Sequence, residues 1–277
     1  MLDGTPAPGP GLQVLGTDTG VGKTRVACLI AKAIRLTHPG ARVGPLKPAA
    51  SGCTHDGPTG RSEDADALRS ASGTDLPDDV VCPVRYRLPL APGVAAQRQG
   101  GFGDGWARIH RALEALTQRS DVVLVEGIGG VQVPMDAGDR ATRRPPITVL
   151  DFAAALGWPA VVVARPSLGT LNHTALTVDA LRLAGVGVIG LIVHAMPQGP
   201  SAVEDDPSLA DNVDWLSRMS GAPVLTVTPR LESAPDPTQE IAPDDPQLQA
   251  VLAVDWLARC RESPRPERVP ALGIGSG

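Results

Sequence analysis

The chain has 277 residues, of which 42% are hydrophobic but only 3% aromatic, so a core must be built mainly from Val, Leu, Ile and Ala. The formal net charge of −5 argues against a nucleic-acid-binding protein and against a basic membrane-binding surface. No hydrophobic run reaches the roughly 20 residues of a membrane-spanning helix, so we expect neither nucleic acid nor a membrane as a partner.

The N-terminal segment and the cysteines indicate a cytoplasmic protein. Residues 1–11 are rich in Gly and Pro and contain no charged region followed by a hydrophobic stretch, so we expect a flexible start without a targeting signal. The cysteines are far apart and form no CxxC pair; they are Cys28, Cys53, Cys82 and Cys260. Reduced thiols fit this spacing best.

Hydrophobic runs alternate with helical patterns along most of the chain. The runs rich in Val, Leu and Ile predict buried strands at 12–16, 42–46, 121–125, 159–164, 187–193 and 223–227. The segments between them predict helices at 23–37, 64–72, 106–119, 148–156, 172–184 and 208–220. We therefore expect an α/β fold with a doubly wound, mostly parallel sheet flanked by helices, which binds ligands at the carboxyl ends of its strands.

Three regions depart from this alternation. Residues 51–63 and 75–104 are rich in Gly, Pro and Asp, which predicts loops near the strand ends. From about residue 231 the chain is proline-rich and acidic, with one predicted helix at 247–260. We expect one domain over 12–262 and a disordered tail over 263–277.

A glycine-rich segment, GTDTGVGKT at 16–24, follows the first predicted strand and opens the first helix. In such a loop the backbone N–H groups turn toward phosphate, Lys23 reaches the terminal phosphates and the Thr24 hydroxyl can hold Mg²⁺. The spacing is one residue longer than the usual P-loop pattern, because Thr17 stands where the first glycine would fall. An ordinary strand-to-helix turn does not require the Gly-Lys-Thr triplet, so the segment predicts a nucleotide site.

Lysine is rare in this chain, which contains only Lys23, Lys32 and Lys47. A codon bias toward arginine explains the general scarcity, but the few lysines that remain are then good candidates for chemistry. Lys23 and Lys47 lie at the ends of predicted strands, whereas Lys32 is expected to be an ordinary residue on a helix surface.

Three further motifs follow predicted strands or open a predicted helix. Lys47 begins KPAASG and would project its charge over the strand ends, beside the glycine-rich loop. The alternative is an ordinary strand-end lysine with a solvated head group. Glu126 directly follows a buried strand, the usual position of a Mg²⁺ ligand or a water-orienting group in nucleotide enzymes. The acidic cluster 63–66 opens a helix, where Glu63 and Asp66 are explained nearly as well as partners of the helix dipole.

The segment 166–174 contains a helix start with Asn172 as a plausible cap, and free N–H groups at such a start attract a carboxylate. His173 is one residue past this cap and is expected to be structural.

Taken together, GTDTGVGKT, KPAASG, DADALRSASG, VEGIGGVQVP and GTLNHTALT resemble the dethiobiotin synthase family, over residues 12 to about 230. The resemblance implies a homodimeric, Mg²⁺-dependent ligase of biotin biosynthesis. Its substrates would be 7,8-diaminopelargonate, CO₂ or bicarbonate, and ATP or another nucleoside triphosphate. The reaction would pass through a carbamate and a carbamic-phosphoric anhydride before the ring closes to dethiobiotin.

The same resemblance implies roles for individual residues. Lys47 and Lys23 would be catalytic, and Thr24, Asp64 and Glu126 would bind the metal; counting back from Gly73 favours Asp64 over Asp66. The implied nucleotide-binding residues are Thr19, Gly20, Val21, Gly22, Lys23, Thr24, Arg25, Asp64, Glu126, Gly127, Ile128, Gly129, His194 and Pro229. The implied substrate-binding residues are Thr19, Lys47, Ser51, Gly169, Thr170, Leu171 and Asn172, of which the last four would come from the neighbouring subunit.

The chain departs from the family at two places. His194-Ala195 replaces an Asn-Asp pair that reads the adenine edge in many members, and a histidine cannot offer the paired donor and acceptor of an amide. We therefore expect a weak preference for adenine. In the segment 89–93, which resembles a substrate-side loop, Gly93 stands where a histidine is frequent.

Two other functions share such a fold. Nucleotide-switched ATPases usually carry an additional lysine early in the loop, where this chain has Thr17, Asp18 and Thr19. A cobyrinate-type amidotransferase needs a glutaminase domain, for which 277 residues leave little room. Both are weaker alternatives than the ligase.

Overall fold

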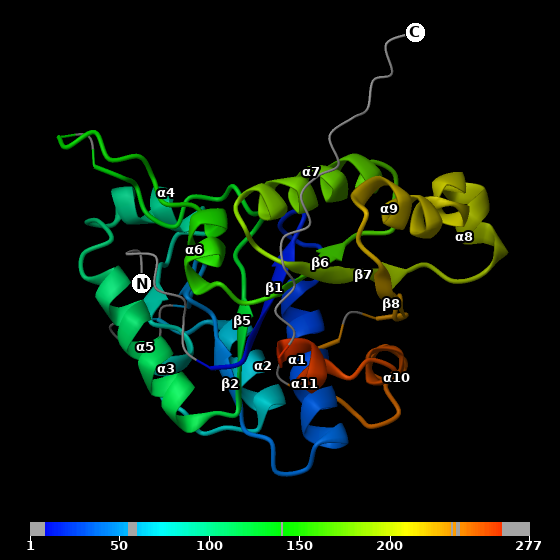
Figure 1. Ribbon diagram of the computed structural model, residues 1–277, viewed down its shortest axis with the longest axis horizontal. Coiled ribbons are helices and arrows are strands. Elements are labelled where there is room, and N and C mark those ends of the chain that lie inside the picture. The colour runs from blue at the N-terminus through cyan, green and yellow to red at the C-terminus, as the bar shows by residue number, and fades with distance from the viewer. Residues whose placement is uncertain (1–8, 55–59, 140, 234, 237–238, 262–277) are drawn as a thin grey trace, which may run out of the picture.

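The computed structural model describes residues 9–54, 60–139, 141–233, 235–236 and 239–261 (Figure 1). The expected tail over 263–277 and most of the expected N-terminal segment lie outside these residues. Gly11, placed in that segment by the sequence, is instead the first residue of β1. A Cβ at Gly11 would lie 2.2 Å from the Trp158 ring, so the strand begins where only a glycine fits.

The strands of the main sheet confirm the expected α/β fold. They are β1 (Gly11–Gly16), β2 (Val43–Leu46), β5 (Val122–Glu126), β6 (Ala160–Ala164), β7 (Val188–Met196) and β8 (Val224–Pro229). They pair in the order β2-β5-β1-β6-β7-β8, and every pairing is parallel. The carboxyl ends of β1, β2 and β5 therefore meet at one edge, where a doubly wound sheet binds its ligands.

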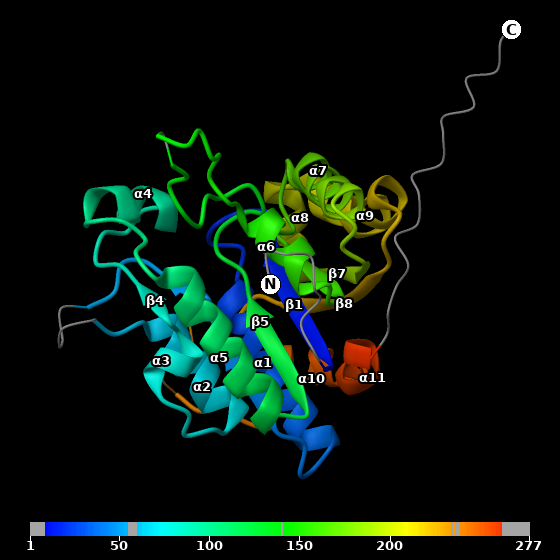
Figure 2. The same ribbon diagram turned by 60° about the vertical axis from the view of Figure 1, so that its left-hand side comes forward.

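Helices cover both faces of this sheet (Figures 1 and 2). One face carries α1 (Lys23–Thr37), α2 (Glu63–Ser72), α10 (Pro246–Leu252) and α11 (Trp256–Arg261). The other carries α5 (Gly105–Arg119), α6 (Val149–Leu156), α7 (Thr170–Leu183) and α9 (Asn212–Ser220). No helix in the described ranges is long and apolar enough to cross a membrane.

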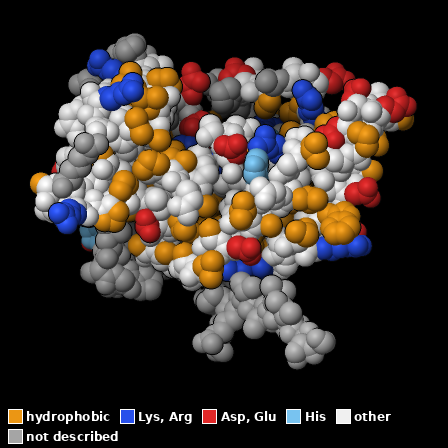
Figure 3. Space-filling view, turned by 90° about the horizontal axis from the view of Figure 1, so that it is seen from above, with side chains coloured by type: hydrophobic (Ala, Val, Ile, Leu, Met, Phe, Trp, Pro, Cys, Tyr) orange, Lys and Arg blue, Asp and Glu red, His pale blue; other side chains and the backbone are white. Residues whose placement is uncertain are grey.

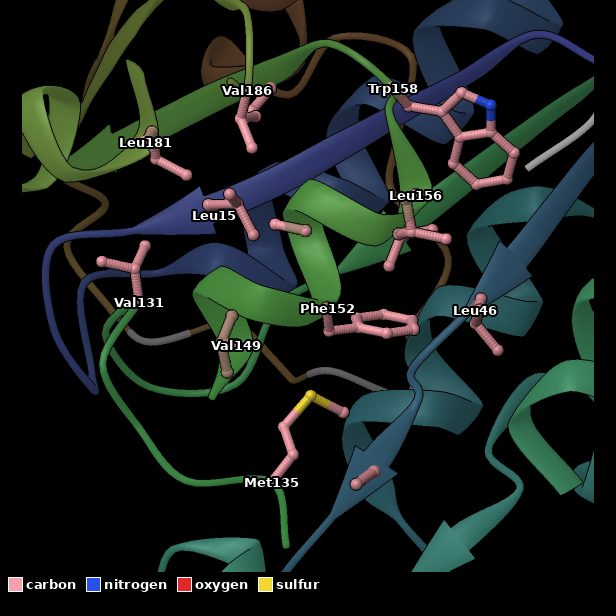
Figure 4. Close-up of a cluster of buried hydrophobic side chains, with 14 of the residues drawn as sticks. Leu15, Leu46, Val131, Met135, Val149, Phe152, Leu156, Trp158, Leu181 and Val186 are labelled. Atoms are coloured by element: carbon pink, nitrogen blue, oxygen red, sulfur yellow. The ribbon is translucent and has the colours of Figure 1, made fainter. Parts of the chain in front are cut away.

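Side chains alternate along the strands between two hydrophobic clusters, one on each face. In β1, Val14 packs toward α1, whereas Leu15 packs toward α6. Figure 4 shows part of the cluster on the α6 face, in which Phe152 of α6 lies among side chains that include Leu15 and Leu46. Aliphatic side chains from strands and helices supply most of the buried core, as the composition requires. All four cysteines are buried free thiols.

The expected loop 75–104 contains short elements that the sequence reasoning missed. They are α3 (Asp78–Val81), β4 (Val84–Arg85) and α4 (Pro92–Arg98). β4 pairs in parallel with β3 (Ala49–Ala50), which directly follows Lys47. Elements this short show no periodicity, and the proline at the start of α4 occupies a position that tolerates its missing N–H.

Three further expectations about helices were wrong. The helix expected at 247–260 is two helices, because Asp255 caps a new start by accepting from the Ala258 N–H at 3.0 Å. The helix expected from residue 208 begins at Asn212, after α8 (Pro200–Asp205) and a 3₁₀ turn, Pro207–Ala210. α7 begins at Thr170 with Gly169 as its N-cap, so Asn172 lies within the first turn and is no cap.

Candidate active site

The glycine-rich loop joins β1 to α1 and wraps around its own lysine. Gly20 and Gly22 have φ values of 74° and 90°, the left-handed region that favours glycine. A Cβ at Gly22 would lie 2.1 Å from the ring of His194, so a side chain is excluded there as well. The Lys23 ammonium is buried and donates to the Asp18 backbone carbonyl at 2.7 Å. The loop thus holds a positive charge beneath backbone N–H groups, the arrangement that binds phosphate.

Lys47 is the centre of a buried ionic cluster at the end of β2. Its Nζ lies 2.5 Å from Glu126 Oε1 and 2.9 Å from Asp64 Oδ2, and the residue is 4% exposed. Burial opposes the charge of Lys47, but the two carboxylates outweigh it and raise the pKa of the ammonium above its usual value. Lys47 is therefore a cation inside the protein rather than a solvated strand-end lysine.

Glu126 and Asp64 face this cation from β5 and α2. Glu126 is fully buried; its Oε1 also accepts from the Thr24 hydroxyl at 2.6 Å, while its Oε2 is buried without a partner. Burial raises the pKa of Glu126, and Lys47 opposes that rise. Burial also raises the pKa of Asp64, but the charge of Lys47 and the hydrogen bonds from Lys47 and Thr24 outweigh it. The pKa of this carboxyl therefore lies below its usual range.

The oxygens of Thr24, Asp64 and Glu126 fit a magnesium ion that is shared with phosphates. Mg²⁺ prefers oxygen ligands and is usually held by one or two carboxylates plus substrate phosphates. The Oε2 of Glu126, buried without a partner, is an oxygen of this kind that would be free to bind such an ion. No group of three or more His, Cys, Asp or Glu side chains in the described ranges is placed to hold a metal by itself.

Asp64, and not Asp66, faces the cluster. Asp66 accepts from Arg61 Nε at 2.5 Å and from Arg69 at 2.7 Å, so its carboxylate is paired with these two arginines and not with Lys47. Both aspartates lie in the first turn of α2, whose start is fixed by Ser62, the N-cap that accepts from the Ala65 N–H.

A cavity of about 550 Å³ opens over this cluster. The implied site residues that line it are Thr19, Gly20, Gly22, Lys23, Thr24, Lys47, Ser51, Asp64, Glu126, Ile128 and Gly129. The segment Pro89 to Ala91, from the loop between β4 and α4, forms another wall together with Val133. Val21 and Gly127 do not line it: Val21 packs in the core, and the Gly127 N–H donates to Val14.

Gly93 follows this wall at a position where no side chain fits. A Cβ there would lie 2.4 Å from the backbone oxygen of Asp136, and the Gly93 N–H donates to the Pro134 carbonyl at 2.9 Å. Close packing of α4 against residues 134–136 thus accounts for the glycine in place of a histidine.

A second cavity, of about 310 Å³, lies between α1, α2 and a third wall formed by Pro235 and by Gln239 to Ile241. Its lining includes Gly22, Thr24 and Arg25 of the phosphate loop and α1, and its walls are mostly apolar. Arg25 donates from Nε to Gln247 at 2.9 Å and forms an ion pair with Asp245, which fixes it to the start of α10.

Lys32, expected on the surface, lines this second cavity instead. It is 9% exposed and forms an ion pair with Glu240 at 2.6 Å. The partner lies in the proline-rich segment far along the chain, so the helix pattern around Lys32 held no sign of it.

His194 and Pro229 line neither cavity. The His194 ring packs against Gly22, and its Nδ1 lies 2.8 Å from the Thr228 hydroxyl. Burial, and then the charge of Arg25, lower the pKa of His194 to about 4, so the ring is neutral near pH 7. The Pro229 carbonyl accepts from Gln247 at 2.8 Å.

Gly169, Thr170, Leu171 and Asn172 also line neither cavity. They form the N-cap and the first turn of α7, beyond the end of β6. Seen from above, this side of the molecule shows acidic, basic and histidine side chains gathered near its middle, with hydrophobic ones around them (Figure 3).

Comparison with known proteins gives a consistent result. A family model described as an AAA domain matches residues 11–238. The chain is 42% identical over 219 residues to an ATP-dependent dethiobiotin synthetase BioD of Anaeromyxobacter dehalogenans, which covers 79% of this chain and 89% of that protein. It is 38% identical over 235 residues to a protein of the same name from Bacillus licheniformis, covering 83% and 89%.

Solved structures support the fold alone. A ParA family ATPase from Chlorobium tepidum superposes with a TM-score of 0.51 at 12% identity, covering 91% of this chain and 99% of that one. A MinC:MinD cell division complex from Aquifex aeolicus gives a TM-score of 0.53 at 16% identity, covering 94% and 99%.

Proposed function

Because this chain belongs to the ATP-dependent dethiobiotin synthetase family, we propose that it closes the ring of dethiobiotin from 7,8-diaminopelargonate, CO₂ and ATP. Membership makes it an ATP-binding P-loop ligase of biotin synthesis; the substrates and the mechanism are our proposal. The observation that carries it is the placement of Lys47, Glu126 and Asp64 beside the Lys23 loop in one cavity.

The reaction needs two anions to meet, and the cavity offers two ammonium groups for them. One amine of the substrate attacks CO₂ and loses a proton, which leaves a carbamate. A carbamate oxygen attacks the γ-phosphorus and ADP leaves. The second amine then attacks the carbonyl carbon of the mixed anhydride, so that phosphate and a proton depart and the ring closes. Positioning and charge neutralisation supply most of the acceleration in such a reaction.

Lys47 and Lys23 divide this task. Lys23 reaches the terminal phosphates from within the loop, and Lys47 holds the carbamate against the γ-phosphate. In the structure Lys47 and Thr24 share Glu126 Oε1. Thr24, Asp64 and Glu126 would hold Mg²⁺, which would supply positive charge against the phosphates, and Lys47 would then be free to bind the reacting anions.

We place the nucleoside of ATP in the smaller cavity. If the phosphates of a nucleotide bind to the phosphate loop, the nucleoside extends past Thr24 and Arg25, where the smaller cavity opens. His194 lies on the other side of Gly22 with one ring nitrogen engaged, which suits it to supporting the loop. Most of the wall area is apolar, and Ser70 and Gln239 are among the polar side chains that line the cavity.

We also propose a homodimer in the cytoplasm. On α7 and just before it, Leu168, Leu176 and Leu183 are 79%, 61% and 80% exposed, and the last two lie seven residues apart, on one face of the helix. A second copy packed over them would bring the first turn of α7, Gly169 to Asn172, to its neighbour's cavity.

A product assay tests the function. The purified protein is incubated with diaminopelargonate, bicarbonate, Mg²⁺ and ATP, and dethiobiotin is sought by mass. We expect dethiobiotin and phosphate in equal amounts. Phosphate release without a urea product would favour a nucleotide-switched ATPase instead.

A further inference from the structure

Arg25, in the first turn of α1, is held by residues at the start of α10. Its Nε donates to Gln247 Oε1 at 2.9 Å, and its Nη2 forms an ion pair with Asp245. The family model matches residues 11–238, whereas α10 begins at Pro246. Both partners of Arg25 therefore come from a part of the chain that lies outside the family match.

These two partners are themselves fixed by further hydrogen bonds. Asp245 Oδ1 accepts from the N–H groups of Gln247 and Leu248, at 2.8 Å and 3.1 Å, and so caps α10. Gln247 is 3% exposed, and its Nε2 donates to the Pro229 carbonyl at the end of β8. Since each partner is anchored on the folded chain, the Arg25 guanidinium is held in one orientation at the wall of the smaller cavity.

A guanidinium held in this way can contact a ligand through its flat face. Its N–H groups lie in the plane of the group, so the contacts to Gln247 and Asp245 use its edge rather than its faces. A planar cation packs favourably on a π-system, and every nucleobase has such a face. Arg25 directly follows Thr24, and both residues line the cavity to which we assign the nucleoside.

We propose that Arg25 is a platform on which the base of the nucleoside triphosphate stacks, and that Gln247 and Asp245 are positioning residues that hold this platform. The inference rests on the proposed function, which places the nucleoside in the smaller cavity. Stacking does not read the hydrogen-bonding edge of a base, so it suits a site whose walls are mostly apolar.

The test separates stacking from charge by means of a ligand without a base. Calorimetry gives Kd for ATP, CTP and inorganic tripolyphosphate, each with Mg²⁺, for the unchanged protein and for Arg25→Lys. We expect Kd for ATP to rise roughly 3- to 30-fold and Kd for CTP to rise less, because lysine keeps the charge but has no flat face and the pyrimidine ring is smaller. Kd for tripolyphosphate should be unchanged. A rise of the same size for all three ligands would overturn the inference, since Arg25 would then act on the phosphates or on the loop.

A double-mutant cycle tests the positioning role of Gln247. In the unchanged background, Gln247→Leu should raise Kd for ATP by roughly 2- to 10-fold, because the guanidinium loses one of its two partners. In the Arg25→Lys background the same substitution should have little effect, since the platform is already lost. An equal rise in both backgrounds would show that Gln247 does not act through Arg25.

Arg42→Lys is the matched control. The Nε and Nη2 of Arg42 likewise donate to a carboxylate, that of Asp121, but Arg42 precedes β2 and lies at the opposite end of this strand from Lys47. It should leave all three Kd values unchanged.

The binding measurements and the product assay distinguish failure of this inference from failure of the proposed function. If the unchanged protein forms dethiobiotin and Arg25→Lys binds ATP equally tightly, the inference alone fails. If Arg25→Lys shows the base-dependent loss but the unchanged protein forms no dethiobiotin, the inference stands and the proposed reaction fails. If the unchanged protein binds no nucleotide, both fail.

Discussion

The edge of the sheet formed by β1, β2 and β5 differs from the end of β6 and the start of α7 in how its charges are compensated. On the first side Lys47 touches two carboxylates, and Thr24 shares one of them. On the second side Arg165 makes one long contact with a carboxylate, and the helix start is uncapped. The charges of the first side are compensated within one chain, whereas the N–H groups of the second side are free to bind acceptors from a ligand or a neighbouring subunit.

Removing Lys47 should have the largest effect on the first side. Lys47→Ala takes away the cation that holds the carbamate against the γ-phosphate, so we expect kcat for dethiobiotin formation to fall by at least about 100- to 1000-fold. Nucleotide binding, measured by calorimetry, should be largely intact because Lys23 and the loop remain. Turnover near the unchanged rate would show that Lys47 does not have this role.

Asp64 and Asp66 form a matched pair for the metal site. Asp64→Asn should raise the Mg²⁺ concentration for half-maximal activity by roughly 10- to 100-fold, since a metal ligand becomes neutral. Asp66→Asn loses only ion pairs with Arg61 and Arg69, so activity should be retained and unfolding should cost about 1 kcal/mol less. A larger magnesium effect in Asp66→Asn would move the ligand assignment to Asp66.

The pH dependence of nucleotide binding tests Lys23. Burial, and then the charge of Lys47, lower the pKa of Lys23 to about 8, so the empty site loses this charge as the pH rises through that value. A bound triphosphate favours the charged form, and binding then takes up a proton. We expect nucleotide affinity to fall by up to about tenfold per pH unit above about pH 8.

Lys23→Arg is the control for this effect, because a guanidinium keeps its charge throughout that range. Its affinity should change little with pH, and an equally steep fall in both proteins would rule out Lys23 as the titrating group. The pH has the opposite effect on the free energy of unfolding from its effect on nucleotide affinity. Lys23 has a lower pKa in the folded protein than the usual 10.5, so its contribution to the free energy of unfolding rises between about pH 8 and pH 10.5.

The choice of nucleobase should show the smallest effect. His194 is engaged by Thr228, and the cavity assigned to the nucleoside has mostly apolar walls. We expect kcat/KM for ATP, CTP and GTP to agree within about tenfold, the scale of discrimination without paired polar contacts. A strong preference for ATP would contradict this expectation and would mean that a polar side chain of the cavity, such as Ser70 or Gln239, reads the base.

The sequence predicted the first side far better than the second. Lys47, Glu126 and the phosphate loop each follow a strand recognisable from its hydrophobic run, and parallel strands end at one edge, so their meeting could be inferred. On the second side the sequence placed the helix cap at Asn172, whereas α7 begins at Thr170 with Gly169 as its N-cap, and only coordinates show that this start has no side-chain cap. The ion pair between Lys32 and Glu240 joins two segments far apart in the sequence, and no local pattern marks it.

Packing limits the sequence-based reasoning in a similar way at Gly93. The sequence alone, with a glycine where a histidine is frequent, predicts looser packing around the substrate at this loop. In the structure the backbone of Asp136 occupies the space that a side chain would need, so the wall of the cavity is tightly packed there. Volume around a backbone atom is a property of the folded chain and leaves no trace in composition or spacing.

Mixing two defective variants tests most directly whether one chain supplies the phosphate side of each site and its neighbour supplies the carboxylate side. Lys47→Ala and Asn172→Asp proteins are unfolded together and refolded as mixed dimers; Asn172→Asp adds a negative charge to the first turn of α7 and should raise KM for the carboxylate-bearing substrate. In such a dimer one site combines an intact Lys47 with an intact first turn of α7 from the other subunit, so dethiobiotin formation with the low KM of the unchanged protein should return. A mixture that shows only the high KM of Asn172→Asp would place both sides within a single chain and contradict this account.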